Sequence, residues 1–122
     1  MAAKIDVKRG DIVYVDLRGA EGTEKQGNRP CVVVQNDKGN QFSPLTIIVP
    51  ITDPGQYKKL PVQVWVTVAE LGADWATKDG SIECGHIRTI DRDARISSVI
   101  GHLPESIMRQ VDQALLISVG LA

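Results

Sequence analysis

The feature that most constrains the fold is a series of short segments rich in β-branched residues, separated by Gly, Pro, Asn and Asp. In residues 11–17, DIVYVDL, successive side chains alternate between two faces, which is typical of a β-strand. Residues 31–35 are apolar on both faces and indicate a central strand. Further strands are expected at residues 45–51, 60–68, 80–91 and 94–103. Many short strands of this kind predict a small, mostly antiparallel barrel.

Several residues interrupt this pattern. Pro50 lies inside an expected strand, where proline indicates an edge or a bulge. Gly85 lies inside another, where glycine marks a bulge or a close approach by backbone or ligand. The composition of residues 36–44 and 53–55 predicts turns, and residues 69–74 allow one helical turn.

One longer helix is expected at residues 104–119. Pro104 suits a first helical turn, and Glu105 complements the helix dipole there. Gly120 is a suitable end. The apolar face is formed by Ile107, Val111, Ala114 or Leu115, and Ser118.

Length and composition predict one globular domain, residues 1–122. Hydrophobic residues make up 43% of the chain, enough for a core without disulfides; Cys31 fits a small buried residue. The net charge of −1 means that any phosphate site must be a local basic patch. We find no signal peptide and no apolar run of about 20 residues. A cytoplasmic location without a membrane partner is therefore expected.

Arg29 stands where a glycine-rich, charged loop meets a buried strand. Adjacent antiparallel strands bring the start of one beside the end of the next, so Arg29 and Thr52 could meet at one rim. Glu24 and Lys25 could fold over them, and Arg88 could add a second cation. The alternative is that these are strand-end residues with structural partners. Cys84 and His86 are a poor ligand pair, so no metal site and no cofactor are expected.

The chain resembles the MazF/PemK family of toxin endoribonucleases. The resemblance covers nearly the whole chain in the family's order, through VKRGDIVYVDL, GTEKQGNRPCVVVQND, GNQFSPLTIIVPIT, KLPVQV, HIRTIDRDARI and IGHLPESIMRQVDQALLISVGL. It implies an SH3-like barrel with a C-terminal helix, similar to MazF, PemK and CcdB. It also implies a homodimer that cuts single-stranded RNA at short sequences without metal, and a MazE-like antitoxin whose extended tail lies in the RNA groove.

The resemblance further implies that Arg29 and Thr52 are the catalytic pair. Thr23 and Glu24 would border the site on a mobile loop, and His86 would lie near the bases. Candidate backbone cations and stacking platforms add further substrate-binding residues: Lys25, Tyr57, Lys58 and Arg88. The loop reads EKQGNRP in place of the commoner E.GG.RP form, and His86 stands where relatives often carry another polar residue.

The reaction implied by the family is attack of the RNA 2′-hydroxyl on phosphorus, giving a 2′,3′-cyclic phosphate and a 5′-hydroxyl. Arg29 suits charge stabilisation because its planar fork matches phosphate. Either Glu24 or His86 could be the general base, since guanidinium hardly deprotonates.

Two other functions fit a chain of this kind. A toxin of the same fold that inhibits DNA gyrase by binding would need contacts on its C-terminal helix and no Arg–Thr pair. An SH3-like peptide-binding module usually lines its groove with several aromatic residues, whereas only 4% of this chain is aromatic.

Overall fold

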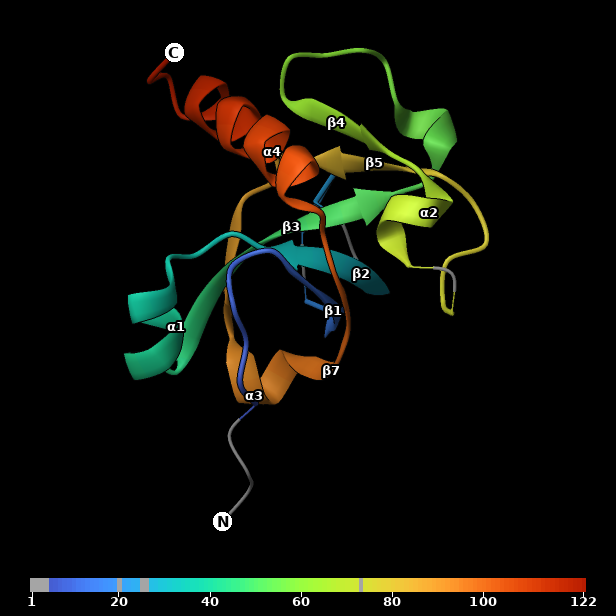
Figure 1. Ribbon diagram of the computed structural model, residues 1–122. Coiled ribbons are helices and arrows are strands. Elements are labelled where there is room, and N and C mark those ends of the chain that lie inside the picture. The colour runs from blue at the N-terminus through green and yellow to red at the C-terminus, as the bar shows by residue number, and fades with distance from the viewer. Residues whose placement is uncertain (1–4, 20, 25–26, 73) are drawn as a thin grey trace.

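The computed structural model describes residues 5–19, 21–24, 27–72 and 74–122. All its strand pairs are antiparallel, and the strand order is β4-β5-β3-β2-β1-β7, with β6 also paired to β3. The strands are β1 (Asp11–Asp16), β2 (Asn28–Val33), β3 (Leu45–Thr52), β4 (Gln63–Val66), β5 (Gly80–Glu83), β6 (Arg88–Asp91) and β7 (Ile96–His102). The helices are α1 (Asp37–Phe42), η1 (Pro54–Gln56, a 3₁₀ turn), α2 (Val68–Leu71), α3 (Arg92–Arg95) and α4 (Glu105–Ser118). The predicted fold class, mostly β and antiparallel with a C-terminal helix, is confirmed (Figure 1).

The alternation predicted for β1 divides its side chains between two hydrophobic cores. Ile12 belongs to the core that α4 covers, whereas Val13, Val15 and Leu17 belong to a second core. Helix α4 lies across β4 and β5 (Figure 1) and buries Ile107, as predicted for its apolar face.

Strand β2 is central, as predicted, because it pairs with β1 on one side and β3 on the other. Pro50 does not lie on an edge strand. Residues Leu45 to Ile48 of β3 pair with β6, whereas Ile51 and Thr52 pair with β5. Pro50 therefore occupies the gap between two partners, where its missing amide hydrogen costs no ladder bond.

Two expectations are corrected. Residues 36–44, expected to be a turn, form helix α1, because the Asn36 side chain accepts a hydrogen bond from the Gly39 amide and caps the helix. Residues 80–91, expected to be one strand, form β5 and β6 with a turn that contains Gly85. Helix α3 was not predicted. Among the described helices, none has the length and apolar character required to cross a membrane.

Candidate functional site

Arg29 and Thr52 line the same cavity, of about 310 Å³. The ladder between β2 and β3 pairs Cys31 with Pro50. Continuing this antiparallel register by two residues puts Arg29 opposite Thr52, at the distance where cross-strand side chains interact. The cavity is completed by Pro30, Ile51, Leu71 and residues 75–80. The structure thus brings the predicted catalytic pair together at one end of the sheet.

Thr52 is buried, and its hydroxyl is engaged on the protein side. Its Oγ1 donates toward the carbonyl oxygen of Ser81 at 3.3 Å and toward Glu83 Oε2 at 3.2 Å. Glu83 also accepts hydrogen bonds from the Ser81 hydroxyl at 2.7 Å and from Gln63 Nε2 at 3.1 Å. Sequence reasoning missed this network. An acidic residue within an apolar strand, Glu83 in GSIEC, was the available signal.

Gly80 allows β5 to approach Thr52 closely. A Cβ added at Gly80 would lie 2.8 Å from Ile51 Cγ2 and 3.2 Å from the Thr52 carbonyl oxygen. Only glycine fits there without a shift of the Ile51 side chain or of β3, so Gly80 helps to fix the position of Thr52.

The cavity beside Arg29 also carries an ion pair that the sequence did not predict. Lys78 Nζ lies 2.8 Å from Asp53 Oδ1, and both side chains are largely exposed. The hydrogen bond from Lys78 lowers the pKa of Asp53, and the charge of Arg29 contributes a smaller effect in the same direction. Asp53 is therefore ionised at neutral pH.

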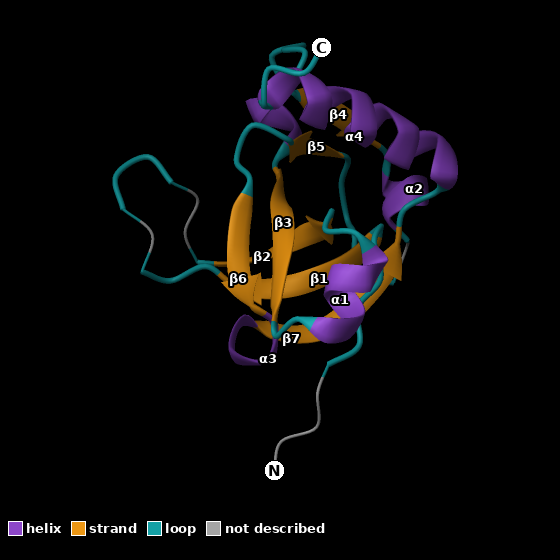
Figure 2. Ribbon diagram, turned by 90° about the vertical axis from the view of Figure 1, so that its left-hand side faces the viewer, coloured by secondary structure: helices purple, strands orange, loops and turns teal. Residues whose placement is uncertain are grey.

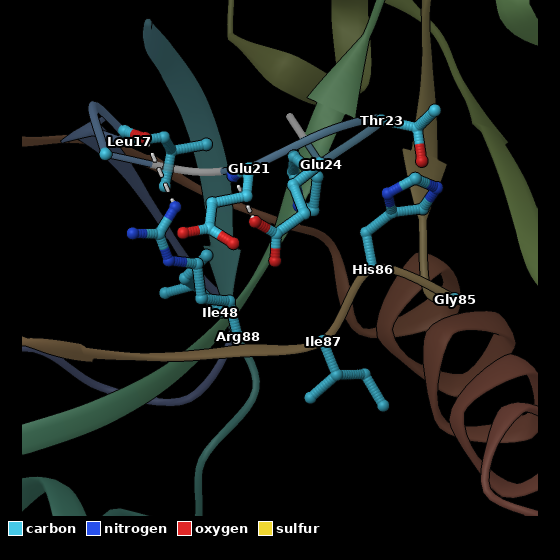
Figure 3. Close-up of a pocket in the computed structure, with 11 residues that line it drawn as sticks. Leu17, Glu21, Thr23, Glu24, Ile48, Gly85, His86, Ile87 and Arg88 are labelled. Atoms are coloured by element: carbon cyan, nitrogen blue, oxygen red, sulfur yellow. Dashed lines mark hydrogen bonds between the residues drawn. The ribbon is translucent and has the colours of Figure 1, made fainter. Parts of the chain in front are cut away.

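Four other predicted residues, Thr23, Glu24, His86 and Arg88, line a second cavity of about 550 Å³. Figure 3 shows Thr23 and His86 approaching one another from opposite sides, with Glu24 between them and Arg88. The walls come from the loop between β1 and β2 and from the turn between β5 and β6. The loop between β1 and β2 projects from the sheet at the left of Figure 2.

Arg88 is held by the main chain: its Nη1 donates to the Leu17 carbonyl oxygen at 3.2 Å. It therefore lines the second cavity and not the cavity of Arg29. The two cavities are neighbours along β3, because Ile48 and Pro50 line one and Thr52 lines the other. These three residues alternate along the strand and so share one face.

Tyr57 and Lys58 follow η1 and line neither cavity. The Tyr57 ring packs edge-on against Trp65, with centroids 5.3 Å apart, and the Lys58 side chain is exposed. Lys25 lies outside the described residues. Within the described ranges, no group of three or more His, Cys, Asp or Glu side chains is arranged to hold a metal ion.

Comparison with known proteins identifies the class. Residues 8–119 match the family model for the PemK-like, MazF-like toxin of type II toxin-antitoxin systems, and the chain belongs to this family. It is 43% identical to the endoribonuclease EndoA of Bacillus subtilis over 115 residues, 94% of this chain and 96% of that one. It is 40% identical to the endoribonuclease MazF of Staphylococcus epidermidis, over 94% of this chain and 92% of that one.

Solved structures share the fold. The MazF of Deinococcus radiodurans superposes with a TM-score of 0.77 at 22% identity, covering 95% of this chain and 98% of that one. A mycobacterial endoribonuclease in complex with its cognate antitoxin gives a TM-score of 0.73 at 22% identity, covering 95% and 97%.

Proposed function

We propose that the chain is the toxin of a type II toxin-antitoxin pair and that it acts as a sequence-specific endoribonuclease on single-stranded RNA. The observation that carries the proposal is the pairing of Arg29 with Thr52 in one cavity, in a chain 40–43% identical to two endoribonucleases over nearly its full length. The RNA supplies its own nucleophile, the 2′-hydroxyl.

The reaction is a transesterification followed by product release. The 2′-oxygen forms a bond to phosphorus, the bond from phosphorus to the 5′-oxygen breaks, the 2′-hydroxyl loses its proton and the 5′-oxygen gains one. The products are a 2′,3′-cyclic phosphate and a 5′-hydroxyl. DNA lacks the 2′-hydroxyl, so the same site binds it without cutting it.

Arg29 stabilises the charge that builds up on the phosphoryl oxygens. Its fork of N–H donors matches two such oxygens, which a lysine cannot do. The β2 ladder fixes its backbone, and Pro30 favours the extended conformation of the residue before it. Thr52 orients the reacting group from the facing strand.

The second cavity reads the bases. Glu21 and Glu24 repel phosphates, but carboxylates accept hydrogen bonds from base amino groups, while His86 and Arg88 offer donors and flat surfaces for stacking. Further contacts along the RNA come from the Tyr57 and Trp65 ring pair and from the cations Lys25 and Lys58. Glu24 and His86 remain candidates for the general base, from the cavity next to that of Arg29.

The partners follow from the same family. We propose a homodimer, an antitoxin of the MazE type, a cytoplasmic location and no membrane contact. Among solved structures of similar fold, one is a mycobacterial endoribonuclease in complex with its cognate antitoxin and another is MazE-MazF from Deinococcus radiodurans.

The test is incubation of the purified protein with a long RNA in EDTA, followed by mapping of the 5′ ends. Discrete cuts by the wild type, lost in Arg29→Ala, support the proposal. RNA that the wild type leaves uncut, or cutting by Arg29→Ala at the wild-type rate, contradicts it. If the Arg29→Ala variant is still toxic to cells, the result points instead to a poison that acts by binding, such as a gyrase inhibitor.

A further inference from the structure

Glu83 is a buried carboxylate beside Thr52, on β5, and it is only 6% exposed. None of the ion pairs within the described part of the chain includes it. A buried charge without a cation costs several kcal/mol unless hydrogen bonds replace its hydration.

The groups around Glu83 are donors. The Ser81 hydroxyl, the Thr52 hydroxyl and the Gln63 amide all reach its two oxygens, at 2.7 to 3.2 Å. The two carboxyl oxygens of Glu83 are the acceptors of all of these hydrogen bonds.

This arrangement fixes the direction of the Thr52 hydroxyl. Both of its partners, Glu83 Oε2 and the Ser81 carbonyl oxygen, accept from it, so the single hydroxyl hydrogen points into the protein. Oγ1 keeps its lone pairs for any group that enters the cavity lined by Thr52. Both distances exceed the usual O–H···O distance of about 2.7–2.8 Å, so the hydrogen is restrained without being tightly bound.

We propose that Glu83 is a positioning residue for RNA cleavage. By holding the Thr52 hydrogen inward, it makes Thr52 Oγ1 an acceptor for the hydrogen bond of the attacking 2′-hydroxyl. This inference rests on the proposed endoribonuclease function. Phosphate oxygens carry no hydrogen, so an acceptor at Thr52 selects the hydroxyl of the substrate over its phosphate.

Gln63 connects this carboxylate to the surface. Its Nε2 donates to Glu83 and to the Gln56 carbonyl oxygen at 2.9 Å, and its Oε1 accepts from the Lys58 amide at 2.8 Å. The turn that carries Tyr57 and Lys58 is thus bound to the same buried network as Thr52. The network gives Glu83 a fixed position from which to orient the hydroxyl.

The test is a double-mutant cycle on RNA cleavage under single-turnover and steady-state conditions, with Glu83→Gln, Thr52→Ala and the double variant. Because misplacement of a reacting group typically costs about 10²-fold, Glu83→Gln is expected to lower kcat by about that factor. KM should stay within about twofold, since Glu83 does not touch the RNA. In the Thr52→Ala background, Glu83→Gln should change the rate by less than about twofold.

Matched controls separate this role from a structural one. Glu105→Gln makes the same substitution at an exposed acid at the start of α4 and should leave the rate unchanged. Thermal unfolding checks that Glu83→Gln folds. If Glu83→Gln does not fold, Glu83→Met is used in its place, because it removes the carboxyl group at similar length.

The inference is overturned if Glu83→Gln cuts at the wild-type rate, if it raises KM alone, or if it slows Thr52→Ala as much as it slows the wild type. It is also overturned if Thr52→Ala keeps full activity. Failure of the wild-type protein to cut any RNA, or full activity of Arg29→Ala, is a different result, because it contradicts the proposed function itself.

Discussion

The two neighbouring cavities differ in how their residues are held. Arg29 and Thr52 stand on facing ends of β2 and β3, and Thr52 is buried among hydrogen-bond partners. Thr23, Glu24 and His86 stand on a projecting loop and a turn, and their side chains are exposed. Strands hold groups within the small tolerance that catalysis needs, whereas loops tolerate sequence change. We infer that the first cavity carries the chemistry and the second the choice of sequence.

The largest expected effect is loss of Arg29. Arg29→Ala removes the donors that we propose bind the phosphoryl oxygens and should lower the cleavage rate by about 10²–10³-fold, which is typical of one such donor. Arg29→Lys should recover little, because an ammonium cannot bind two oxygens in a fork. The measurement is the single-turnover rate on a short RNA. Near-wild-type activity in the lysine variant would show that only charge is needed.

The next effect concerns the backbone under Thr52. Gly80→Ala puts a methyl group 2.8 Å from Ile51 Cγ2 and 3.2 Å from the Thr52 carbonyl oxygen, so the Ile51 side chain or β3 must shift. We expect the free energy of unfolding to fall by about 1–3 kcal/mol, which is typical of overpacking, and kcat to fall by about tenfold. Gly55→Ala is the matched control, because an added Cβ there meets nothing within 4 Å. Equal rates for the two variants would show that cleavage tolerates movement of Thr52.

Substitutions in the second cavity are expected to change the sequence of the cut sites more than the rate of cleavage. His86→Ala should change which bases flank the cut sites, at a cost of about 1–3 kcal/mol in the binding of one preferred base. Deep sequencing of the 5′ ends from a long RNA measures this. His102→Ala, outside both cavities, is the control. An unchanged cleavage motif would remove His86 from recognition, and abolished cleavage of every sequence would make it the general base.

The smallest effect is on stability at high pH. Burial raises the pKa of both Cys31 and Cys84 from 9.0 to about 12. The unfolded chain releases these protons near pH 9 and the folded chain does not, so their stabilisation is complete below pH 9 and is lost between pH 9 and 12. At pH 10 each thiol should contribute on the order of 1 kcal/mol less to the free energy of unfolding.

Denaturant unfolding at pH 8 and pH 10 measures this loss. The double variant Cys31→Ala and Cys84→Ala isolates the thiols from the tyrosines and lysines that titrate in the same range. The variant should lose less stability than the wild type between the two pH values. Equal losses would contradict the buried, neutral state of the thiols.

The sequence predicted most of the strands because their side chains alternate, and it allowed Arg29 and Thr52 to meet because adjacent antiparallel strands bring opposite ends together. It did not predict that β3 changes partners at Pro50, because a proline within a strand is equally typical of a strand at the edge of a sheet. It did not predict α1, because Asn36 serves a turn or a helix cap with the same side-chain bond.

The positions of the site residues were predictable only where the pairing of two adjacent strands determines them. The sequence offered Arg88 as a second cation beside Arg29, but the turn between β5 and β6 brings it to the second cavity. At Gly85 the sequence had suggested a bulge or a close approach, and not a turn. Glu83 was missed because its role depends on three donors from β3, β4 and β5 that lie far apart in the chain. Only the folded sheet brings such a set together.

The central claim is that the strand-held cavity of Arg29 and Thr52 promotes attack by the RNA's own 2′-hydroxyl. The most direct test uses a short RNA that contains one mapped cut site and an otherwise identical strand with a single 2′-deoxynucleotide just before the cut. The account predicts that, in EDTA, the first is cut to a 2′,3′-cyclic phosphate and the second is bound with similar affinity but not cut at that position. Cleavage of the deoxy-substituted strand at the same site, or a product that carries a 5′-phosphate, would contradict it.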